Sequence, residues 1–274
     1  MAITNFISTV WSENLYKELD KQYIAVANCN REFEGDIKDH GSVVKVCGVG
    51  SVTISNYNKN TDMSAPQTLS DTCKEIAIDR AKFFNFQIDD IDKAQASPNL
   101  MNAAMSVAAS ALANEADKYI YALHTQAGSN ISLSDANEDN VINAIIDARQ
   151  RLYENNVTDA SNVVIEVSPA VAALILKAKV ALASDNGDAL EKGCLGSIGG
   201  CKVFVSNNIA VVDGTHKCII RTTRAIAYAE QLSEIVAYRP EKRFADAIKG
   251  LHLYGASVIY PKEMVVLNVS FPAA

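Results

Sequence analysis

The hydrophobic positions near the start of the chain repeat with the period of an α-helix. Between residues 3 and 24, apolar side chains recur every three or four positions with charged residues between them, which predicts an amphipathic helix. The apolar stripe consists of Phe6, Ile7, Val10, Trp11, Leu15 and Leu19. Because such a stripe has to pack against something, we expect residues 3–24 to dock on the rest of the subunit or on a neighbouring one.

A different pattern fills residues 35–80, where glycines interrupt short β-branched runs. Val43–Val46 and Ser51–Ile54 are typical of strands, and Thr72–Ile78 is typical of a returning strand. The stretch between them, residues 56–62, is polar and turn-prone. Two strands with little apolar mass are marginal on their own in water. We therefore expect this excursion to lie on another surface.

A long helix is predicted over residues 97–127. Ser97 and Pro98 form a favourable helix start. The body of the helix is rich in alanine, including Ala108 and Ala109 at its centre. Small side chains allow a helix to lie close to a sheet or to another backbone. The pattern does not say which of these two alanines faces inward.

Helices and strands alternate through the rest of the chain. The expected elements are a helix over 137–155, a strand over 161–167, a helix over 169–183, a glycine-rich loop over 193–200, strands over 203–206 and 218–222, a short helix over 224–230, and alternating strand-like residues over 234–270. Strands and helices are partly segregated, which favours an α+β fold.

Composition limits the partners of this chain. Apolar residues make up 49% and charged residues 21% of its 274 residues, with a net charge of −7. A protein that grips DNA needs a basic excess to displace counterions, and an acidic chain is also disfavoured at an anionic membrane. We see no targeting segment and no run long enough to span a membrane. We expect a cytoplasmic chain whose six cysteines are reduced.

Patterns typical of catalytic or metal sites are weak. The four histidines are isolated from one another and from the cysteines, so no zinc site is predicted. Cys194 and Cys201 bracket the glycine-rich loop, but their spacing is not that of a redox motif. The segment around Ser197 resembles a nucleophile elbow without its first glycine. The residues therefore predict no catalytic group, no cofactor and no metal.

One ordered set of motifs is more specific for a protein family than the patterns above. The run Asn30-Arg31-Glu32-Phe33-Glu34-Gly35-Asp36-Ile37 is followed by Gly41, by Val44-Lys45-Val46, by Gly50-Ser51-Val52-Thr53-Ile54, and by Tyr57 and Asn60. This order resembles the opening of tailed-bacteriophage major capsid proteins with the Hong Kong 97 type of fold. Val164–Pro169, Lys202–Asn207 and Arg243–Val269 are similar to later segments of the same family.

The resemblance implies a division of the chain. It assigns residues 1–34 to an N-terminal arm and residues 35–80 to an extended loop. Residues 81–140 and 237–274 would form a peripheral domain with a spine helix over 97–127, and residues 141–236 would form an axial domain. Assembly contacts are expected at Trp11, Phe33, Glu34, Tyr57 and Lys59.

The resemblance also implies a role. The chain would be a structural, non-enzymatic subunit that forms the hexamers and pentamers of an icosahedral phage head. That head would enclose double-stranded DNA without specific binding and without a membrane. Separate scaffolding, portal or decoration proteins are the further partners that such a shell implies. The protein would be assembled in the bacterial host cytoplasm and would end in the virion.

Other hypotheses stay open at this point. Within the same fold, an encapsulin-like bacterial compartment would package enzymes instead of a genome. An α/β hydrolase or redox enzyme would use Cys194, Ser197 or Cys201. A membrane-surface or partner-binding module would be built on residues 3–24. Particles containing DNA, measurable turnover, or affinity for liposomes would separate these hypotheses.

Overall fold

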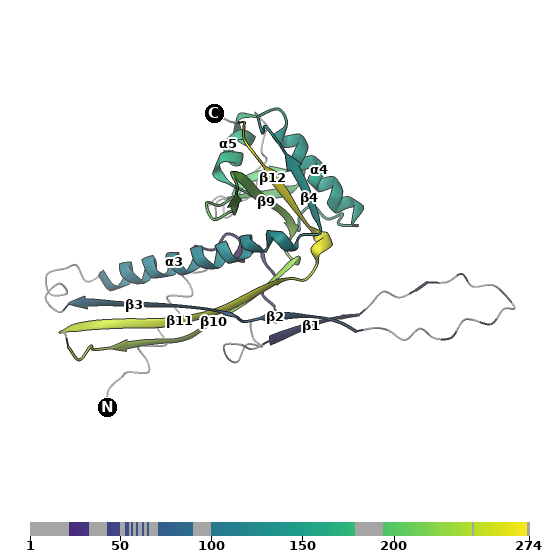
Figure 1. Cartoon of the computed structure of the whole chain (residues 1–274). Helices are drawn as coiled ribbons and strands as arrows, with labels where there is room; N and C mark the ends of the chain where they lie inside the picture. Colours follow the sequence, from purple (N-terminus) through teal and green to yellow (C-terminus); the bar gives the residue numbers. More distant parts are fainter. Residues whose placement is uncertain are drawn as a thin grey trace.

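The described part of the chain builds a long layer, a lobe above it and a projecting ribbon (Figure 1). In this computed structural model the described residues are 22–32, 43–49, 53–54, 56, 59, 62, 65, 71–89, 100–178, 194–242 and 244–272. Their strands form sheets of two, three and seven strands. Most of the predicted amphipathic helix at residues 3–24 lies outside this set, which begins at Gln22.

The long layer is an antiparallel sheet with one helix along its face (Figure 1). Its strands are β3 (Arg80–Asp89), β10 (Ile226–Tyr238) and β11 (Ala245–Val258), in the order β10-β11-β3. The helix is α3 (Leu100–Ala122), which continues into the 3-10 turn η3 (Leu123–Gln126). The long helix predicted over residues 97–127 is confirmed from residue 100 to residue 126, and its predicted start lies outside the described residues.

The small residues of α3 lie where the helix meets the rest of the core. Its buried side chains recur at helical spacing: Met105, Ala109, Leu112, Ala113, Ala116 and Ile120. They belong to one apolar cluster with Ile235 and Ile248 of the sheet. Ala109 is fully buried, whereas Ala108 is only half-buried. Ala109 is therefore the alanine of this pair that faces inward.

The lobe contains a mixed sheet covered by two helices. Its strand order is β4-β12-β9-β5-β7-β6, with β8 paired to β9, and β12–β4 and β5–β7 are parallel. The strands are β4 (Ser129–Leu133), β5 (Val163–Val167), β6 (Cys194–Ile198), β7 (Cys201–Val205), β8 (Val211–Val212), β9 (Thr215–Thr222) and β12 (Met264–Val269). The helices are α4 (Val141–Glu154) and α5 (Pro169–Lys177). Ser168 caps α5 by accepting a hydrogen bond from the Val171 N–H, and Pro169 opens that helix.

The ribbon consists of two antiparallel strands, β1 (Val43–Val49) and β2 (Asp71–Ala77). Ala77 is followed closely by Arg80, so β2 runs almost directly into β3 (Figure 1). The ribbon is thus a continuation of an edge strand of the long layer. The strands predicted at 43–46 and 72–78 are confirmed by β1 and β2.

Two local predictions are wrong. A short helix is expected at residues 224–230, but residues 226–230 are strand. Ile226 and Tyr228 pack into one apolar cluster and Ala227 and Ala229 into another; two-sided burial favours a strand over helix propensity. The glycine-rich loop expected at 193–200 is instead strand β6, followed by a turn at Gly199 and Gly200 with positive φ that leads into β7.

The sheets also divide the chain differently from the segments expected from sequence. β10 begins within the segment 141–236 but pairs with β11 in the long layer, whereas β12 and β4, which lie outside that segment, belong to the sheet of the lobe. Strands that pair across long sequence separations carry no local signal of their partner. The edge strands β3 and β4 are absent from the sequence-based prediction.

Candidate assembly site

The first candidate site is the arm root, defined as residues 22–32, which lies against three other segments. One of them is α3, whose Asp117 side chain is buried. Its carboxylate accepts hydrogen bonds from the backbone N–H groups of Ile24, Ala25 and Val26 at 3.0–3.1 Å. These N–H groups lie at the start of η1 (Val26–Asn28). A carboxylate at the beginning of a helical turn satisfies donors that have no partner within the turn.

The second partner of the arm root is an ion pair within the sheet of the lobe. The Arg221 guanidinium of β9 donates to both carboxylate oxygens of Glu166 on β5, at 3.1 and 3.0 Å, and both side chains are fully buried. The same guanidinium donates to the carbonyls of Asn28 at 2.6 Å and Ala25 at 3.1 Å. The pair therefore holds the backbone of the arm root against the lobe.

The third partner is Glu230 on β10, which is contacted by side chains of the arm root, of β10 itself and of β11. Its carboxylate accepts hydrogen bonds from the hydroxyls of Tyr23 at 2.5 Å and Tyr228 at 2.9 Å. Arg31 donates to its other oxygen at 2.7 Å, and the His252 Nε2 lies 2.9 Å away. The backbone of Asn30 completes the attachment by bonding with Ile226 and Tyr228. Both ends of the arm root are thus fixed to β10.

Burial and hydrogen bonding act in opposite directions on these carboxyl groups. Burial raises the pKa of Asp117 to about 7, although its backbone hydrogen bonds oppose the shift. Burial would also raise the pKa of Glu230, but the hydrogen bond and charge of His252, the Tyr23 hydroxyl and the Arg31 charge outweigh it, so that its pKa lies below the ordinary value.

The second candidate site is the ribbon root, defined as Val44, Ile76 and Ile78. These side chains are buried in an apolar cluster with Leu253 on β11 and the alanines of β10. Lys74 also donates to the Val258 carbonyl at 3.0 Å. Gly255 makes this approach possible because a Cβ at that position would overlap the backbone oxygen of Ala77. The surface on which the root of the ribbon lies is therefore part of its own subunit.

Several other described side chains of the ribbon are exposed, whereas Val46 is half-buried against the ribbon root. Val43 is half-exposed, Ile54 is 94% exposed, and Lys45 and Glu75 form only a surface ion pair of 3.7 Å. Cys73 is exposed and disulfide-bonded. The expectation that every cysteine is reduced is therefore wrong for Cys73, whereas Cys29, Cys201 and Cys218 are free and buried.

Only one residue of the predicted contact set falls within the described part of the chain. Lys59 is described and exposed, as an assembly contact requires. Trp11, Phe33, Glu34 and Tyr57 lie outside the described residues, so their roles stay predictions. Sequence reasoning missed the residues that hold the arm root. Glu166 interrupts the otherwise apolar strand β5, and Arg221 directly follows the apolar run Cys218–Ile220 of β9. A charge in a buried strand predicts an oppositely charged partner.

The hairpin of β6 and β7 excludes the proposed nucleophile elbow. That motif needs a sharp strand-to-helix turn, whereas Ser197 lies within β6, opposite Lys202 of β7. Burial raises the pKa of the Cys201 thiol, which opposes thiolate formation. Cys201 is free, and its ladder partner is Ile198 rather than Cys194. The redox-pair hypothesis therefore gains no support from this hairpin.

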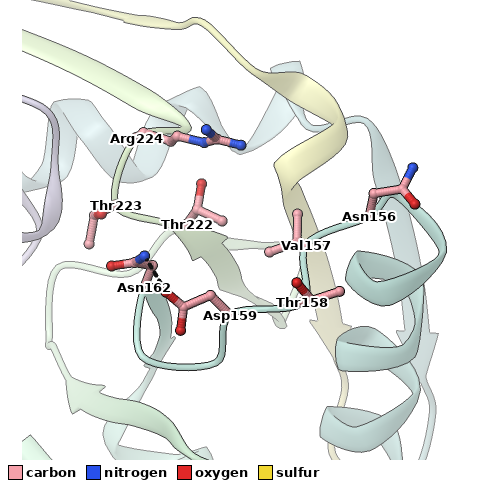
Figure 2. Close-up of a pocket in the computed structure, with 8 residues that line it drawn as sticks. All are labelled: Asn156, Val157, Thr158, Asp159, Asn162, Thr222, Thr223 and Arg224. Carbon is pink, nitrogen blue, oxygen red and sulfur yellow. Dashed lines mark hydrogen bonds between the residues drawn. The ribbon is translucent and has the colours of Figure 1, made fainter.

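A cavity of about 310 Å³ lies between the loop after α4 and the end of β9 (Figure 2). Its lining residues are Asn156, Val157, Thr158, Asp159, Asn162, Thr222, Thr223 and Arg224. The charged groups that line it have partners. Asp159 accepts from Ser161 and Asn162, and Arg224 makes a two-pronged pair with Glu263. The charged groups of this cavity are therefore engaged in contacts within the fold.

Metal-ligating groups and membrane-spanning helices are both missing from the described residues. These residues contain no group of three or more histidine, cysteine or acidic side chains placed to hold a metal ion. None of their helices is long and apolar enough to cross a membrane.

Solved structures resemble this chain along most of its length. A structure from Mycobacterium phage Che8 is 28% identical and superimposes with a TM-score of 0.72, covering 90% of this chain and 91% of that one. The chain has the fold of tailed-phage capsid proteins. The mature capsid of bacteriophage PhiM1 matches at 14% identity and a TM-score of 0.67, over 90% and 87% of the two chains. The capsid of cyanophage P-SCSP1u matches at 13% identity and a TM-score of 0.66, over 89% of this chain and 87% of that chain.

These similarities confirm the resemblance to tailed-phage capsid proteins that the motifs predicted. At 13–14% identity the two capsid structures establish a shared fold. No protein-family model matches the sequence, and no curated protein matches it.

Proposed function

We propose that this chain is the major capsid protein of a tailed phage, a structural subunit that forms the hexamers and pentamers of an icosahedral head around double-stranded DNA. The observation that carries the proposal is the match over about nine-tenths of the chain to phage structures, two of them capsids. The fold therefore supports a role in assembly over a role in chemistry, and we propose that the chain is not an enzyme.

The form of the subunit supports this role. A closed shell requires heterologous contacts in which each subunit gives one surface and receives another. The ribbon projects from the body, and among its described residues those of the root are buried in their own subunit. We propose that residues 35–80 act as the extended loop, residues 1–34 as the arm and α3 as the spine helix. The layer of β3, β10 and β11 would be the peripheral domain and the lobe the axial domain.

Exposed apolar residues offer a further contact surface on the long layer. Phe83 is 78% exposed and lies opposite Leu251, which is also exposed. Their neighbours Phe84 and Phe86 pack with the cluster beneath α3. Because successive strand residues point to opposite faces, Phe83 points away from α3. An exposed apolar face of this kind is typical of a surface that meets a partner.

The charge of the chain fits a container for DNA. Its net charge of −7 disfavours tight phosphate binding, so packaged DNA would not adhere to the wall. Scaffolding, portal or decoration proteins are the further partners that a phage head implies. We place assembly in the bacterial host cytoplasm and the finished protein in the virion. Neither the encapsulin-like alternative nor the enzyme alternative gains support from the similar phage structures.

Purification of the expressed chain, followed by size-exclusion chromatography and negative-stain electron microscopy, tests the proposal. Hexamers, pentamers or closed particles are expected, with DNA in particles purified from infected cells. Particles that enclose enzymes and never DNA would support the encapsulin-like alternative. A strictly monomeric chain with measurable turnover would contradict the proposal.

A further inference from the structure

Two cysteines stand opposite each other in the ribbon. The register of β1 and β2 makes Cys47 the ladder partner of Cys73. Residues directly opposite in an antiparallel pair have Cα atoms about 4.5 or 5.5 Å apart. Disulfides span Cα separations of about 4.4–6.8 Å. The backbone of the ribbon is therefore suited to a direct bridge between these two positions.

Cys73 is already disulfide-bonded, so the question is which cysteine it is bonded to. Cys29, Cys201 and Cys218 are free. Cys194 belongs to β6, which lies in the sheet of the lobe, opposite Phe204. We propose that Cys47 and Cys73 form a disulfide that staples the ribbon where it leaves the body of the subunit, and that this bond closes only after the chain leaves a reducing cytoplasm.

The position of the proposed disulfide in the ribbon determines which residues it would constrain. Val44 pairs with Ile76, and this pair is buried in the ribbon root. Lys45 and Glu75 come next and are exposed. The cysteine pair lies further along the same ladder. The bond would thus close residues 48–72 into a covalent loop whose base no longer depends on the surface pair of Lys45 and Glu75. Such a closure reduces the conformational freedom of the open chain.

The step needs an oxidant, which we name as a small-molecule disulfide. One ribbon thiol loses its proton and attacks this disulfide, releasing one small thiolate and forming a mixed disulfide. The second ribbon thiol then loses its proton and attacks the cysteine sulfur of that bond, which releases the second small thiolate. Two protein thiols are oxidised, one small disulfide is reduced to two thiols, and the atoms balance. Exposure of Cys73 leaves it accessible to this reagent.

The consequence for a shell rests on the proposed function. Thiols stay reduced in a cytoplasm, so subunits would assemble with an unstapled ribbon that can adjust to its neighbour. Oxidation after release would then fix the ribbon in the conformation that the neighbour has imposed. A bond that is absent during assembly and present outside the cell adds stability without constraining assembly.

Proteolysis of the purified subunit tests the bond itself without any need for particles. Lys59 lies between the two cysteines and is exposed, so a lysine-specific protease is expected to cut there. After incubation with oxidised glutathione, the two fragments should run as one band on a non-reducing denaturing gel and as two bands after reduction. Cys73→Ser and Cys47→Ser should each give two bands under both conditions. Glu75→Ser, a change at a neighbouring exposed position of the ladder, should behave as wild type.

Peptide mass mapping without reductant decides the pairing. A linked pair of peptides containing Cys47 and Cys73 is expected. Alkylation of Cys73 in the oxidised sample, or a link from Cys73 to another cysteine or another subunit, would overturn the proposal. In particles, reductant should lower the disruption temperature of wild type and leave the Cys47→Ser/Cys73→Ser variant unchanged. Equal temperatures for wild type with and without reductant would overturn the role in the shell while leaving the mapped bond intact.

Discussion

The guanidinium of Arg221 lies 3.0 and 3.1 Å from the two carboxylate oxygens of Glu166, and neither side chain reaches solvent. The remaining hydrogen bonds of Arg221 go to the carbonyls of Asn28 and Ala25 in the arm root. One side chain thus neutralises a buried charge on β5 and attaches a segment far away in sequence. These two roles can be separated by mutation.

Arg221→Leu should destabilise the subunit strongly, because it leaves Glu166 buried without its partner. Loss of one member of a buried pair typically costs about 3–5 kcal/mol. The double variant Glu166→Leu/Arg221→Leu should recover part of that stability in denaturant unfolding. It should not restore slow hydrogen exchange at residues 24–28, because the two carbonyl contacts stay lost. A double variant no more stable than Arg221→Leu would contradict this account of the ion pair.

The contrast between Ala109 and Ala108 tests the packing of α3. Ala109 is fully buried in the cluster between the helix and the sheet, and Ala108 is not. Ala109→Phe should overpack that cluster and lower the free energy of unfolding by about 1–3 kcal/mol. Ala108→Phe is the matched control and should change it much less. Thermal unfolding of both variants would show whether the difference has the expected sign.

Sequence reasoning found the elements whose signal is local. The helical period and the alanines of α3, the apolar run of β5 and the Ser168–Pro169 start of α5 each identify an element without knowledge of its partner. The alanines at the start of β10 favour the helix expected over 224–230, whereas burial on both faces decides that residues 226–230 are strand. β12 was assigned with the strands of the long layer because pairing with β9 and β4 leaves no trace in neighbouring residues.

The arm root could not be predicted from the sequence for the same reason. Asp117, Glu166, Arg221 and Glu230 come from four separate elements. Asp117 and Arg221 bind the backbone of residues 24–28, and Glu230 binds the side chains of Tyr23 and Arg31. Almost every residue type offers the same backbone carbonyl and N–H groups, so contacts to the backbone leave no pattern in the sequence. The available signal is limited to Glu166 within the apolar run of β5 and Arg221 next to the apolar run of β9.

Glu230 makes part of the stability depend on acid pH. Its folded-state pKa is lowered, whereas an unfolded glutamate titrates near pH ~4.3. The charged form is therefore favoured in the folded state, and its contribution is fully present above about pH 4.3 and lost as pH falls through the lower folded value. The difference in melting temperature between wild type and Glu230→Gln should be largest near pH ~6 and should shrink below pH ~4. A constant difference, or equal shrinkage for the exposed control Glu75→Gln, would refute this prediction.

Phe83 tests the exposed face of the long layer. Phe83→Ser removes a side chain that is 78% exposed, so the melting temperature of the free subunit should change little. If this face meets a neighbouring subunit, the yield of particles should fall several-fold. Lys82→Ser is the control, because Lys82 lies on the same strand and forms a surface ion pair with Glu115. Particle yield is measured by sedimentation. Unchanged yield for Phe83→Ser would place the contact elsewhere.

The ribbon offers the most direct link between the fold and assembly, because its root and the rest of its length should respond differently. Val44, Ile76 and Ile78 are buried in their own subunit, so the amides of β1 and β2 near the root should exchange slowly in both free subunits and particles. Ile54 and Lys59 are exposed, and two strands without a third are marginal. Amides between residues 50 and 65 should therefore exchange fast in free subunits and slowly in particles, where a neighbour supplies the missing surface.

Gly255→Ala provides the control on the root. A Cβ at position 255 would overlap the Ala77 backbone, so amide exchange at the root should speed up even in the free subunit. Strong protection of residues 50–65 in the free subunit would mean that the whole ribbon belongs to its own core, and the assembly role of the ribbon would then lose its physical basis.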